Sequence, residues 1–334
     1  MLITSFYVII FYLPLLLRLS NCNMLPVILV HGGAGDIMDS RVPAKIAGVK
    51  AAVKAGYAAF EKGGTVVDAV EAAVRIMEDD PAFNAGYGSV VNLEGEVEMD
   101  ASIMIGSNLS AGAVTVVQDI ANAISLARLV MEKTPHVLLA AHGAKKFAID
   151  QGIPILPPGS LVTDTALEAL ENYKKYGTQL TEIAAVKNKG EVGTVGAVAV
   201  DAEGHVAAAT STGGITGKMV GRSSDTSVLG SGSYADDQFG AVSTTGHGET
   251  IMKFCVAHTI IKAMENGKSA DQATIDTINA MTAKLNNTAG AITVSKTGEI
   301  GIAFSSKRMA WAYRQGNEVH YGIERGQHEK EPAE

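Results

Sequence analysis

The chain has 334 residues, of which 47% are hydrophobic and 19% are charged, values that fit a globular protein with a substantial core. Its net charge of -8 at pH 7 argues against a nucleic acid as its partner. The two cysteines, Cys22 and Cys255, form no CxxC pair, and the eight histidines form no HExxH or Cys/His cluster. We therefore expect no disulfide framework, no zinc site and no catalytic transition metal.

The first 23 residues differ in composition from everything that follows. Residues 1–17 are aliphatic and aromatic, interrupted by Pro14, and resemble the apolar part of a signal peptide with a cleavage zone at residues 20–23. No Lys or Arg precedes this run, and it is too short and too broken for a transmembrane helix. Translation from Met24 would leave a cytosolic protein, which we favour. A working signal peptide would instead direct the protein to the secretory pathway or the lysosome.

Apolar periodicity predicts both strands and helices along the chain. Thr65, with Asp68 three residues later, predicts a helix that starts with a capping box. Ser269 and Gln272 predict a second one. The expected strands are residues 25–30, 97–104, 195–200 and 206–210, followed by hairpins that pair 291–295 with 299–304 and 309–313 with 318–323. The expected helices are residues 46–60, 66–77 and 120–131, with two more that begin near Gly248 and after Ser269.

This order of elements predicts an α+β fold. Strands, then helices, then strands joined in hairpins argue for mostly antiparallel sheets covered by helices. On the expected helix after Gly248, the apolar face includes Cys255 and His258, so we expect both to be core residues. Residues 157–193 are rich in charge and weakly periodic past Tyr173, and we expect them to form a flexible linker.

The most informative local feature is the dipeptide Gly193-Thr194, just before the strand over residues 195–200. A threonine hydroxyl is a poor nucleophile unless a base lies beside it. Cleavage between these two residues would supply that base, because the freed α-amino group of Thr194 has a pKa of about 7.7–8.0 and is partly neutral near pH 7. Gly193 can adopt the strained dihedral angles that self-cleavage needs. Taken alone, the pair also fits the start of an ordinary core strand.

Five further motifs accompany this dipeptide. They are VHGGAG at residues 30–35, DDPAFNAGYGS at 79–89, ATSTGG at 209–214, GRSSD at 221–225 and VSTTGHGE at 242–249. With these motifs, nearly all of residues 24–325 resembles the plant-type (type 2) asparaginase and isoaspartyl peptidase family of N-terminal-nucleophile hydrolases. The resemblance is specific because the motifs are separate and follow the family's order.

The resemblance implies a fold, a processing step and an activity. The fold would be a four-layer αββα sandwich of two mostly antiparallel sheets. Self-cleavage would give an alpha chain of residues 24–193 and a beta chain of residues 194–334, with Gly193 and Asn84 taking part in the autoprocessing. The mature enzyme would use Thr194 to hydrolyse L-asparagine to L-aspartate and ammonia, and β-aspartyl peptides to aspartate and a shorter peptide.

The resemblance also assigns roles around the nucleophile. Thr212 would position it through a hydrogen bond, although its Ser-Thr-Gly-Gly segment also fits a simple capped turn. Thr245 and Gly246 would form the oxyanion hole, with a hydroxyl and a backbone N–H aimed at the developing negative oxygen. Their loop also fits a segment that merely precedes a helix, and the helix beginning at Gly248 would direct its positive dipole end toward the site.

Arg222 and Asp225 are the residues that we expect to clamp the substrate. An amino acid with free α-groups is a zwitterion, so Arg222 can take its carboxylate in a two-pronged contact and Asp225 can take its ammonium. Opposite charges three residues apart otherwise fit a surface ion pair. L-asparagine and a β-aspartyl dipeptide present the same two groups, and one clamp would therefore serve both. The resemblance adds Gly248 to the substrate-binding residues.

No cofactor or metal is expected to take part in catalysis. The resemblance implies a structural sodium ion bound by backbone carbonyls in the loop before Asn84, and a dimer of alpha/beta heterodimers. The expected partners are small-molecule and β-aspartyl peptide substrates, with no nucleic acid and no membrane.

Three alternatives remain open. A glycosylasparaginase-like amidohydrolase would suit a working signal peptide, but that group has a bulky residue where this chain has Ala197. A threonine endopeptidase of the same fold would need a longer linker. An uncleaved binding protein for aspartate-like zwitterions belongs to another class, and the presence of Thr194, Thr212 and Thr245 argues against it.

Overall fold

The computed structural model describes residues 24–176 and 193–333, so the expectations for residues 1–23 and for the second part of the linker lie outside the described residues. The strands are β1 (Val27–Gly35), β2 (Met99–Ile105), β3 (Ala111–Val117), β4 (Leu138–Ala140), β5 (Val195–Val200), β6 (Val206–Thr212), β7 (Ser233–Asp236), β8 (Gly240–Gly246), β9 (Ala289–Ser295), β10 (Ile300–Phe304), β11 (Arg308–Gln315), β12 (Glu318–Gly322) and β13 (Glu329–Pro332). The α-helices are α1 (Val42–Glu61), α2 (Val66–Glu78), α3 (Ala123–Lys133), α4 (Ala141–Asp150), α5 (Asp164–Tyr176), α7 (Gly248–Phe254), α8 (Val256–Glu265) and α9 (Ala270–Leu285).

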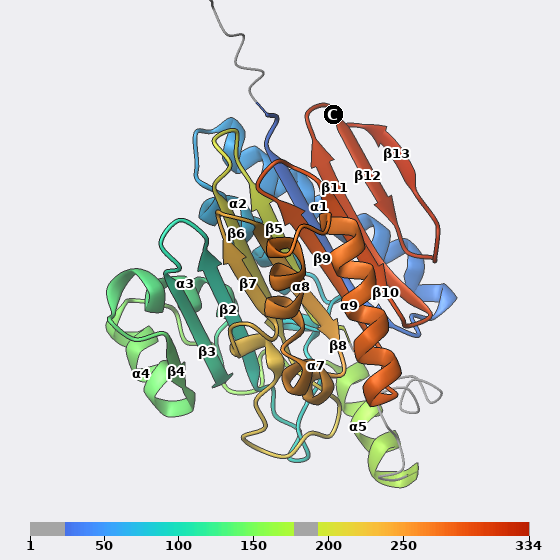
Figure 1. Cartoon of the computed structure of the whole chain (residues 1–334). Coiled ribbons are helices and arrows are strands. Elements are labelled where there is room, and N and C mark those ends of the chain that lie inside the picture. Colours follow the sequence, from blue (N-terminus) through green and yellow to red (C-terminus); the bar gives the residue numbers. More distant parts are fainter. Residues whose placement is uncertain (1–23, 177–192, 334) are drawn as a thin grey trace, which may run out of the picture.

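Two sheets lie face to face between two layers of helices (Figure 1). The larger sheet has the strand order β13-β12-β11-β1-β5-β6-β2-β3-β4, and the smaller one has the order β10-β9-β8-β7. Neighbouring strands are antiparallel except for the pair β3 and β4. Helices α1, α2 and α3 pack on the larger sheet, and α8 and α9 pack on the smaller one. The predicted α+β class and αββα sandwich are confirmed.

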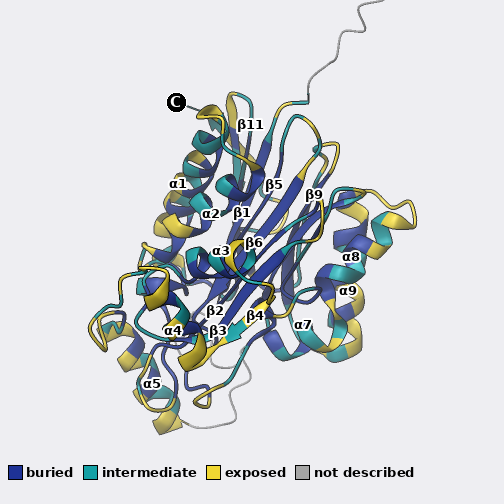
Figure 2. Ribbon diagram, turned by 90° about the vertical axis from the view of Figure 1, so that its left-hand side faces the viewer, coloured by how far each residue is buried: buried dark blue, intermediate teal, exposed yellow. Residues whose placement is uncertain are grey.

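Strands at the centre of the larger sheet are buried on both faces (Figure 2). In β5, Val195, Ala197 and Ala199 pack on the helical side, whereas Val198 and Val200 face the smaller sheet. Burial on both faces explains why this strand is a continuous apolar run rather than an alternating one. The close-packed core on both sides leaves the start of β5 little freedom to move.

Local capping signals are confirmed in one case and half confirmed in the other. The Thr65 hydroxyl accepts the Asp68 N–H at 3.3 Å, and the Thr65 N–H donates to the Asp68 carboxylate at 2.7 Å, which completes the capping box. Ser269 accepts the Gln272 N–H at 3.1 Å. The Gln272 side chain donates instead to Asp276 at 2.7 Å, so the second box lacks its return bond. Both predicted C-terminal hairpins, β9–β10 and β11–β12, are confirmed.

Three expectations about elements are corrected. The expected linker contains α5, whose Ala166 and Leu170 are buried four residues apart and pack that helix on the core. The helix after Gly248 is split at Cys255, which has φ +51 and separates α7 from α8. Cys255 is exposed, so its prediction as a core residue was wrong, while His258 is half-buried edge-on to the Tyr234 ring. Strands β3, β4, β7, β8 and β13 and helix α4 were not anticipated.

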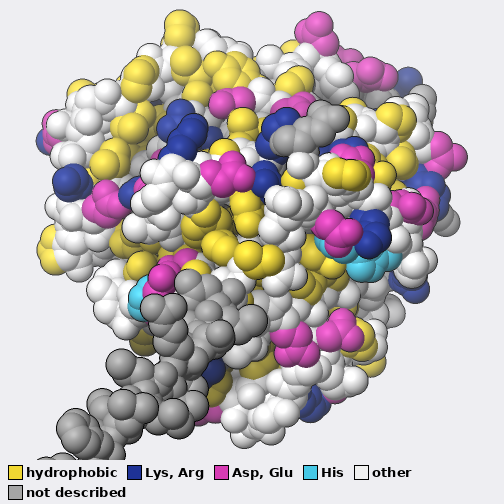
Figure 3. Space-filling view, turned by 90° about the horizontal axis from the view of Figure 1, so that it is seen from above, with side chains coloured by type: hydrophobic (Ala, Val, Ile, Leu, Met, Phe, Trp, Pro, Cys, Tyr) yellow, Lys and Arg dark blue, Asp and Glu magenta, His cyan; other side chains and the backbone are white. Residues whose placement is uncertain are grey.

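The surface carries both signs of charge. On the face shown in Figure 3, acidic and basic side chains are interspersed rather than separated into fields of one sign. Helices in the described part of the chain are all too short or too polar to cross a lipid bilayer.

Candidate active site

Thr194 lies at the entrance of β5, between β1 and β6 in the larger sheet. Val195 pairs with Ser211, so the antiparallel register brings Thr194 beside Thr212, the last residue of β6. Thr194 is only 6% exposed. A side chain at the end of a strand packed on both faces has a well-defined position, which a nucleophile requires.

The backbone before Thr194 lies directly against the glycine turn of β1. A Cβ atom on Gly33 would lie 2.5 Å from the Cα of Gly193, and a Cβ atom on Gly193 would lie 2.7 Å from the Cα of Gly33. Gly33 also has φ +103, a conformation that glycine adopts readily. Two glycines are therefore needed for the approach of these two segments.

Thr245 and Gly246 end strand β8 next to the same turn. The Thr245 hydroxyl is fully buried and accepts the N–H of Ala34, the residue after Gly33, at 3.1 Å. Gly246 has φ +131, and a Cβ atom there would lie 2.7 Å from the Cα of Ala289. The turn thus links the two residues assigned to the oxyanion hole with the Gly193–Thr194 junction.

Asn84 holds the turn that follows Thr212. The Nδ2 of Asn84 donates to the Gly214 carbonyl at 2.8 Å, and the backbone carbonyl of Asn84 accepts the Gly213 N–H at 3.0 Å. The Thr212 hydroxyl accepts the Gly214 N–H at 3.0 Å. Because this oxygen already accepts a bond, its proton can be donated to a further acceptor, such as the neighbouring Thr194 oxygen.

Arg222, Asp225 and Gly248 form a second group of residues near this turn. A Cβ atom on Gly248 would lie 2.8 Å from Nη2 of Arg222 and 2.9 Å from Oδ1 of Asp225. A Cβ atom on Gly214 would lie 3.1 Å from Nη1 of Arg222. The two predicted clamp charges therefore flank one glycine, and the guanidinium reaches back to the turn that Asn84 holds.

Asp225 is a deeply buried carboxyl group. Burial raises its pKa to about 7, against the opposing effects of the Arg222 charge and of the Thr244 hydroxyl, which donates to Oδ2 at 3.2 Å. The charge of Asp100 raises the pKa further. A buried carboxyl group near neutrality is well suited to receive a cation, because an ammonium would stabilise its ionised form.

Asp100 positions the Asp225 turn, and the sequence analysis did not identify it. Its Oδ2 accepts the Ser224 N–H at 2.8 Å, and the Ser224 hydroxyl in turn accepts the Thr226 N–H at 3.2 Å, which caps the short 3-10 helix that Asp225 begins. Its Oδ1 accepts the N–H of Val116, a β-branched residue at φ +55. Such strained positions persist where the surroundings fix them. The partners are up to 124 residues apart in sequence, so no local pattern marked them.

A second unpredicted group lies under the start of β5. Nε2 of His31 lies 2.8 Å from the Ser243 hydroxyl, which lies 2.8 Å from the Thr210 hydroxyl. Gly196 makes room for this chain, because a Cβ atom there would lie 2.5 Å from Nε2. Burial lowers the pKa of His31 to about 3, although the backbone of Thr194 raises it. The imidazole is therefore neutral at pH 7 and ties both sheets together beneath the nucleophile.

The loop before Asn84 has carbonyl oxygens that could hold a cation. A Cβ atom on Gly88 would meet the carbonyl oxygens of Pro81 and Phe83, and one on Gly86 would meet that of Glu78. Carbonyl oxygens are ligands that hard cations prefer. Backbone carbonyls are therefore available in this loop as the kind of ligand that the structural sodium ion implied by the resemblance would take.

Comparison with known proteins gives consistent matches over the described part of the chain and beyond. A family model described as "Asparaginase" matches residues 24–323. An isoaspartyl peptidase/L-asparaginase of Homo sapiens is 50% identical over 303 residues, 90% of this chain and 97% of that protein. A protein of the same name from Xenopus laevis is 48% identical over 312 residues, 93% of this chain and 99% of that protein. One from Danio rerio is 47% identical over 311 residues, with the same coverage of both.

Proposed function

This chain belongs to the asparaginase family, and we propose that Thr194 is the nucleophile with which it hydrolyses L-asparagine and the isoaspartyl bond of β-aspartyl peptides. The observation that carries the assignment to Thr194 is its position. It lies at the entrance of a strand buried on both faces, beside Thr212, with the preceding Gly193 packed against Gly33. The chain is accordingly a hydrolase of amide bonds at the β-carbonyl of an aspartyl group.

The reaction needs two bond exchanges. The α-amino group of the freed Thr194 removes the proton from its own hydroxyl, and Oγ attacks the β-carbonyl of the substrate. The bond from the carbonyl carbon to nitrogen breaks, and ammonia or the shorter peptide leaves with the proton. Water then attacks the ester formed with Oγ, which releases aspartate and restores the hydroxyl.

The Thr245 hydroxyl and the Gly246 N–H would stabilise the negative charge that develops on the carbonyl oxygen of the substrate. A hydroxyl and an N–H group placed before the reaction stabilise an oxyanion far more in a buried site than they would in water. Full burial of Thr245 and its fixed contact with Ala34 support this role. The hydroxyl of Thr212, which accepts from Gly214, supports the proposal that it donates to Thr194.

The α-groups of the substrate identify which compounds are accepted. Arg222 would bind the α-carboxylate and Asp225 the α-ammonium, with Gly248 leaving space for the carbon that carries both. L-asparagine and β-aspartyl peptides share this part and differ in the group that leaves. The same contacts would also bind the product L-aspartate.

Self-cleavage before Thr194 would divide the protein into residues 24–193 and 194–334. Thr194 is then the cleaving group in the intact chain and the nucleophile afterwards. The close packing of Gly193 against Gly33 and the hydrogen bond from Asn84 to the turn after Thr212 support a junction that is fixed in place. A structural sodium ion held by backbone carbonyls of the loop before Asn84 would fix that loop.

We also propose an assembly and a compartment. The processed protein would be a dimer of alpha/beta heterodimers, and light scattering after gel filtration tests this. It would act in the cytosol, a proposal supported by the lack of a Lys or Arg before the apolar run of residues 1–17 and by the possible start at Met24, and tested by fractionation of cells that make the full chain. A working signal peptide would move the protein to the secretory or lysosomal fraction.

The experiment compares the parent chain with Thr194→Ala and Thr194→Ser. On a denaturing gel, the parent gives two fragments, Thr194→Ala gives one intact chain without hydrolase activity, and Thr194→Ser cleaves more slowly because a hydroxyl remains. Two fragments from Thr194→Ala would exclude this nucleophile. An intact and inactive parent would instead favour the binding protein for zwitterions, and activity on glycosylated asparagine alone would favour the glycosylasparaginase alternative.

A further inference from the structure

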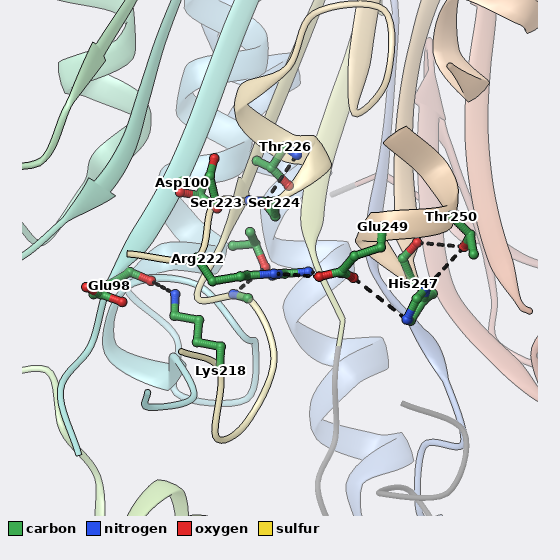
Figure 4. A network of polar contacts seen from close by, with 12 residues as sticks. Glu98, Asp100, Lys218, Arg222, Ser223, Ser224, Thr226, His247, Glu249 and Thr250 are labelled. Carbon is green, nitrogen blue, oxygen red and sulfur yellow. Dashed lines mark hydrogen bonds and ion pairs between the residues drawn. The ribbon is translucent and has the colours of Figure 1, made fainter. Parts of the chain in front are cut away.

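We propose that Glu249 is a positioning residue for the substrate clamp, which holds the Arg222 guanidinium in the orientation that receives the substrate α-carboxylate. Arg222 donates from Nε to Oε1 of Glu249 at 3.0 Å and from Nη2 to Oε2 at 3.0 Å (Figure 4). The inference rests on the proposed function, because it concerns the same substrate and the same arginine.

This two-pronged contact fixes both the place and the plane of the guanidinium. A single hydrogen bond would let the flexible arginine side chain rotate, whereas two parallel bonds to one carboxylate do not. The Arg222 side chain is 13% exposed and that of Glu249 is 37% exposed, so the arginine end of the contact is shielded from water and salt more than the carboxylate end. Glu249 can act as a fixed anchor because it stands in the first turn of α7.

The edge that Glu249 binds contains Nε and Nη2, and it does not contain Nη1. Nη1 lies beside Gly214, and Nη2 lies beside Gly248, where Asp225 is also found. The terminal nitrogens therefore point to the glycines that border the clamp. If the guanidinium kept only one of its two hydrogen bonds to Glu249, it could rotate and move Nη1 away from Gly214. The substrate α-carboxylate would then meet one donor instead of two.

The charges around this pair keep it ionised. Burial raises the pKa of Glu249, but hydrogen bonds from Arg222 and its positive charge outweigh this and hold that pKa below its ordinary value. Nε2 of His247 lies 3.7 Å from Oε2 of Glu249, and its Nδ1 lies 3.2 Å from the Thr250 hydroxyl. The ammonium of Lys218, bound to the Glu98 and Gly213 carbonyls, lies on the Gly214 side of the arginine.

An alternative role for Glu249 predicts the opposite change in KM when the residue is removed. As an internal carboxylate, it could occupy Arg222 in place of the substrate and have to leave before the substrate binds. Removing it would then tighten substrate binding. Under the positioning role, removing it weakens binding, so the direction of the change in KM separates the two.

The test uses Glu249→Ala and Glu249→Gln in the full chain, with Asp276→Ala as a control that removes another carboxylate from an ion pair, at 2.7 Å from Lys268. We expect Glu249→Ala to raise KM for L-asparagine and a β-aspartyl dipeptide by about 10- to 100-fold, because the substrate α-carboxylate would lose a charge-assisted contact. The value of kcat should change little. Glu249→Gln keeps one acceptor oxygen, so its KM should lie between those of the parent and Glu249→Ala. The KM of Asp276→Ala should match that of the parent.

Two further measurements exclude a merely structural effect. The same dipeptide with its α-carboxylate capped as an amide should show no difference between Glu249→Ala and the parent. In a double-mutant cycle, Glu249→Ala should add nothing to Arg222→Ala, because the residue that it positions is gone. An equal loss on the capped dipeptide, additive effects, or a lower KM would overturn the proposal.

Failure of this proposal can be told apart from failure of the proposed function. The L-aspartate affinity of Glu249→Ala, measured by calorimetry, should fall by the same factor as its KM rises, and this needs no turnover. A parent chain that cleaves neither substrate would overturn the function, while the aspartate titration would still test Glu249. If Glu249→Ala does not fold, as judged by its self-cleavage and melting temperature, Glu249→Gln decides the outcome.

Discussion

Gly33 and Gly193 lie backbone against backbone, although Gly33 belongs to β1 and Gly193 lies two residues before the start of β5. A Cβ atom on Gly33 would come within 2.5 Å of the Gly193 Cα and 2.9 Å of its carbonyl carbon. That carbon belongs to the peptide bond proposed to be cut. The first strand therefore lies against the proposed cleavage site, and the N–H of Ala34 in its turn donates to the hydroxyl of Thr245.

Gly33→Ala should therefore block self-cleavage. The new methyl group would displace the Gly193 carbonyl from the place where Thr194 attacks it, and alanine is also strained at φ +103. Gly63→Ala is the matched control, since Gly63 has φ +78 but no atom within 4 Å of its added methyl group. On a denaturing gel, we expect an intact chain for Gly33→Ala and two fragments for Gly63→Ala. Full cleavage of the Gly33 variant would show that the contact is dispensable.

Asp225→Ala should weaken the use of L-asparagine and β-aspartyl dipeptides together. Both present the same ammonium, and a hydrogen bond between charged groups contributes roughly 1.5–3 kcal/mol, or about 10- to 150-fold in kcat/KM. Self-cleavage should continue, because it uses no free substrate. Steady-state kinetics on both substrates provide the measurement. Loss of one activity alone would mean that Asp225 is not the shared anchor.

His31→Gln should lower stability and change its pH dependence. The folded-state pKa of about 3 lies below the usual 6.5, so the unfolded chain binds a proton that the fold excludes. This contribution to the free energy of unfolding is complete above pH 6.5 and is lost as the pH falls toward 3. Loss of the bond to buried Ser243 should cost about 1–3 kcal/mol at pH 7.

This comparison is best made in the Thr194→Ala background, where one intact chain simplifies the unfolding equilibrium. Urea titrations at pH 7 and pH 5 give the free energies. His142→Gln, on the exposed side of α4, is the control and should leave the value at pH 7 unchanged. Equal stability of His31→Gln and the parent at both pH values would contradict the interpretation of the buried network.

Sequence patterns anticipated the features that depend on neighbours along the chain. The Thr65 capping box and the hairpin of β5 and β6 depend on a few adjacent residues, and both are present. Cys255 was misjudged because apolar spacing alone does not reveal a left-handed residue that divides a helix. Asp100 gave no signal, and Glu249 ended a recognised motif without a role of its own, since the role of a single carboxylate depends on the partner that folding brings to it.

The residues around the proposed nucleophile were identified through resemblance rather than through spacing. Thr212 and Thr245 stand at the ends of strands in different sheets, and no periodicity relates one to the other. His31 lay within a recognised motif, but its partner Ser243 is 212 residues away. Contacts of this kind follow from the packing of two sheets, which the sequence specifies only through the fold as a whole.

The pH dependence of the reaction should identify the general base. If the base is the α-amino group of Thr194, kcat should fall as that amine is protonated, at or below its reference pKa of about 7.7–8.0, because the Arg222 charge and partial burial would lower it. The value of kcat/KM reports the free enzyme and should also fall as Asp225, with its pKa raised to about 7, takes up a proton. Asp225→Asn should abolish the fall in kcat/KM that comes from protonation of Asp225 and keep the fall in kcat that comes from protonation of the amine.

His247 is the histidine that could be mistaken for the base. Burial lowers its pKa, and its Nδ1 already faces the Thr250 hydroxyl at 3.2 Å. His247→Gln should therefore keep most of the activity and the same acid limb of kcat, measured between pH 5 and pH 9. The variant removes only the imidazole and leaves the backbone between Gly246 and Gly248 in place. If the acid limb disappeared in this variant, the imidazole would be the base, and the mechanism based on the amino group of Thr194 would have to be abandoned.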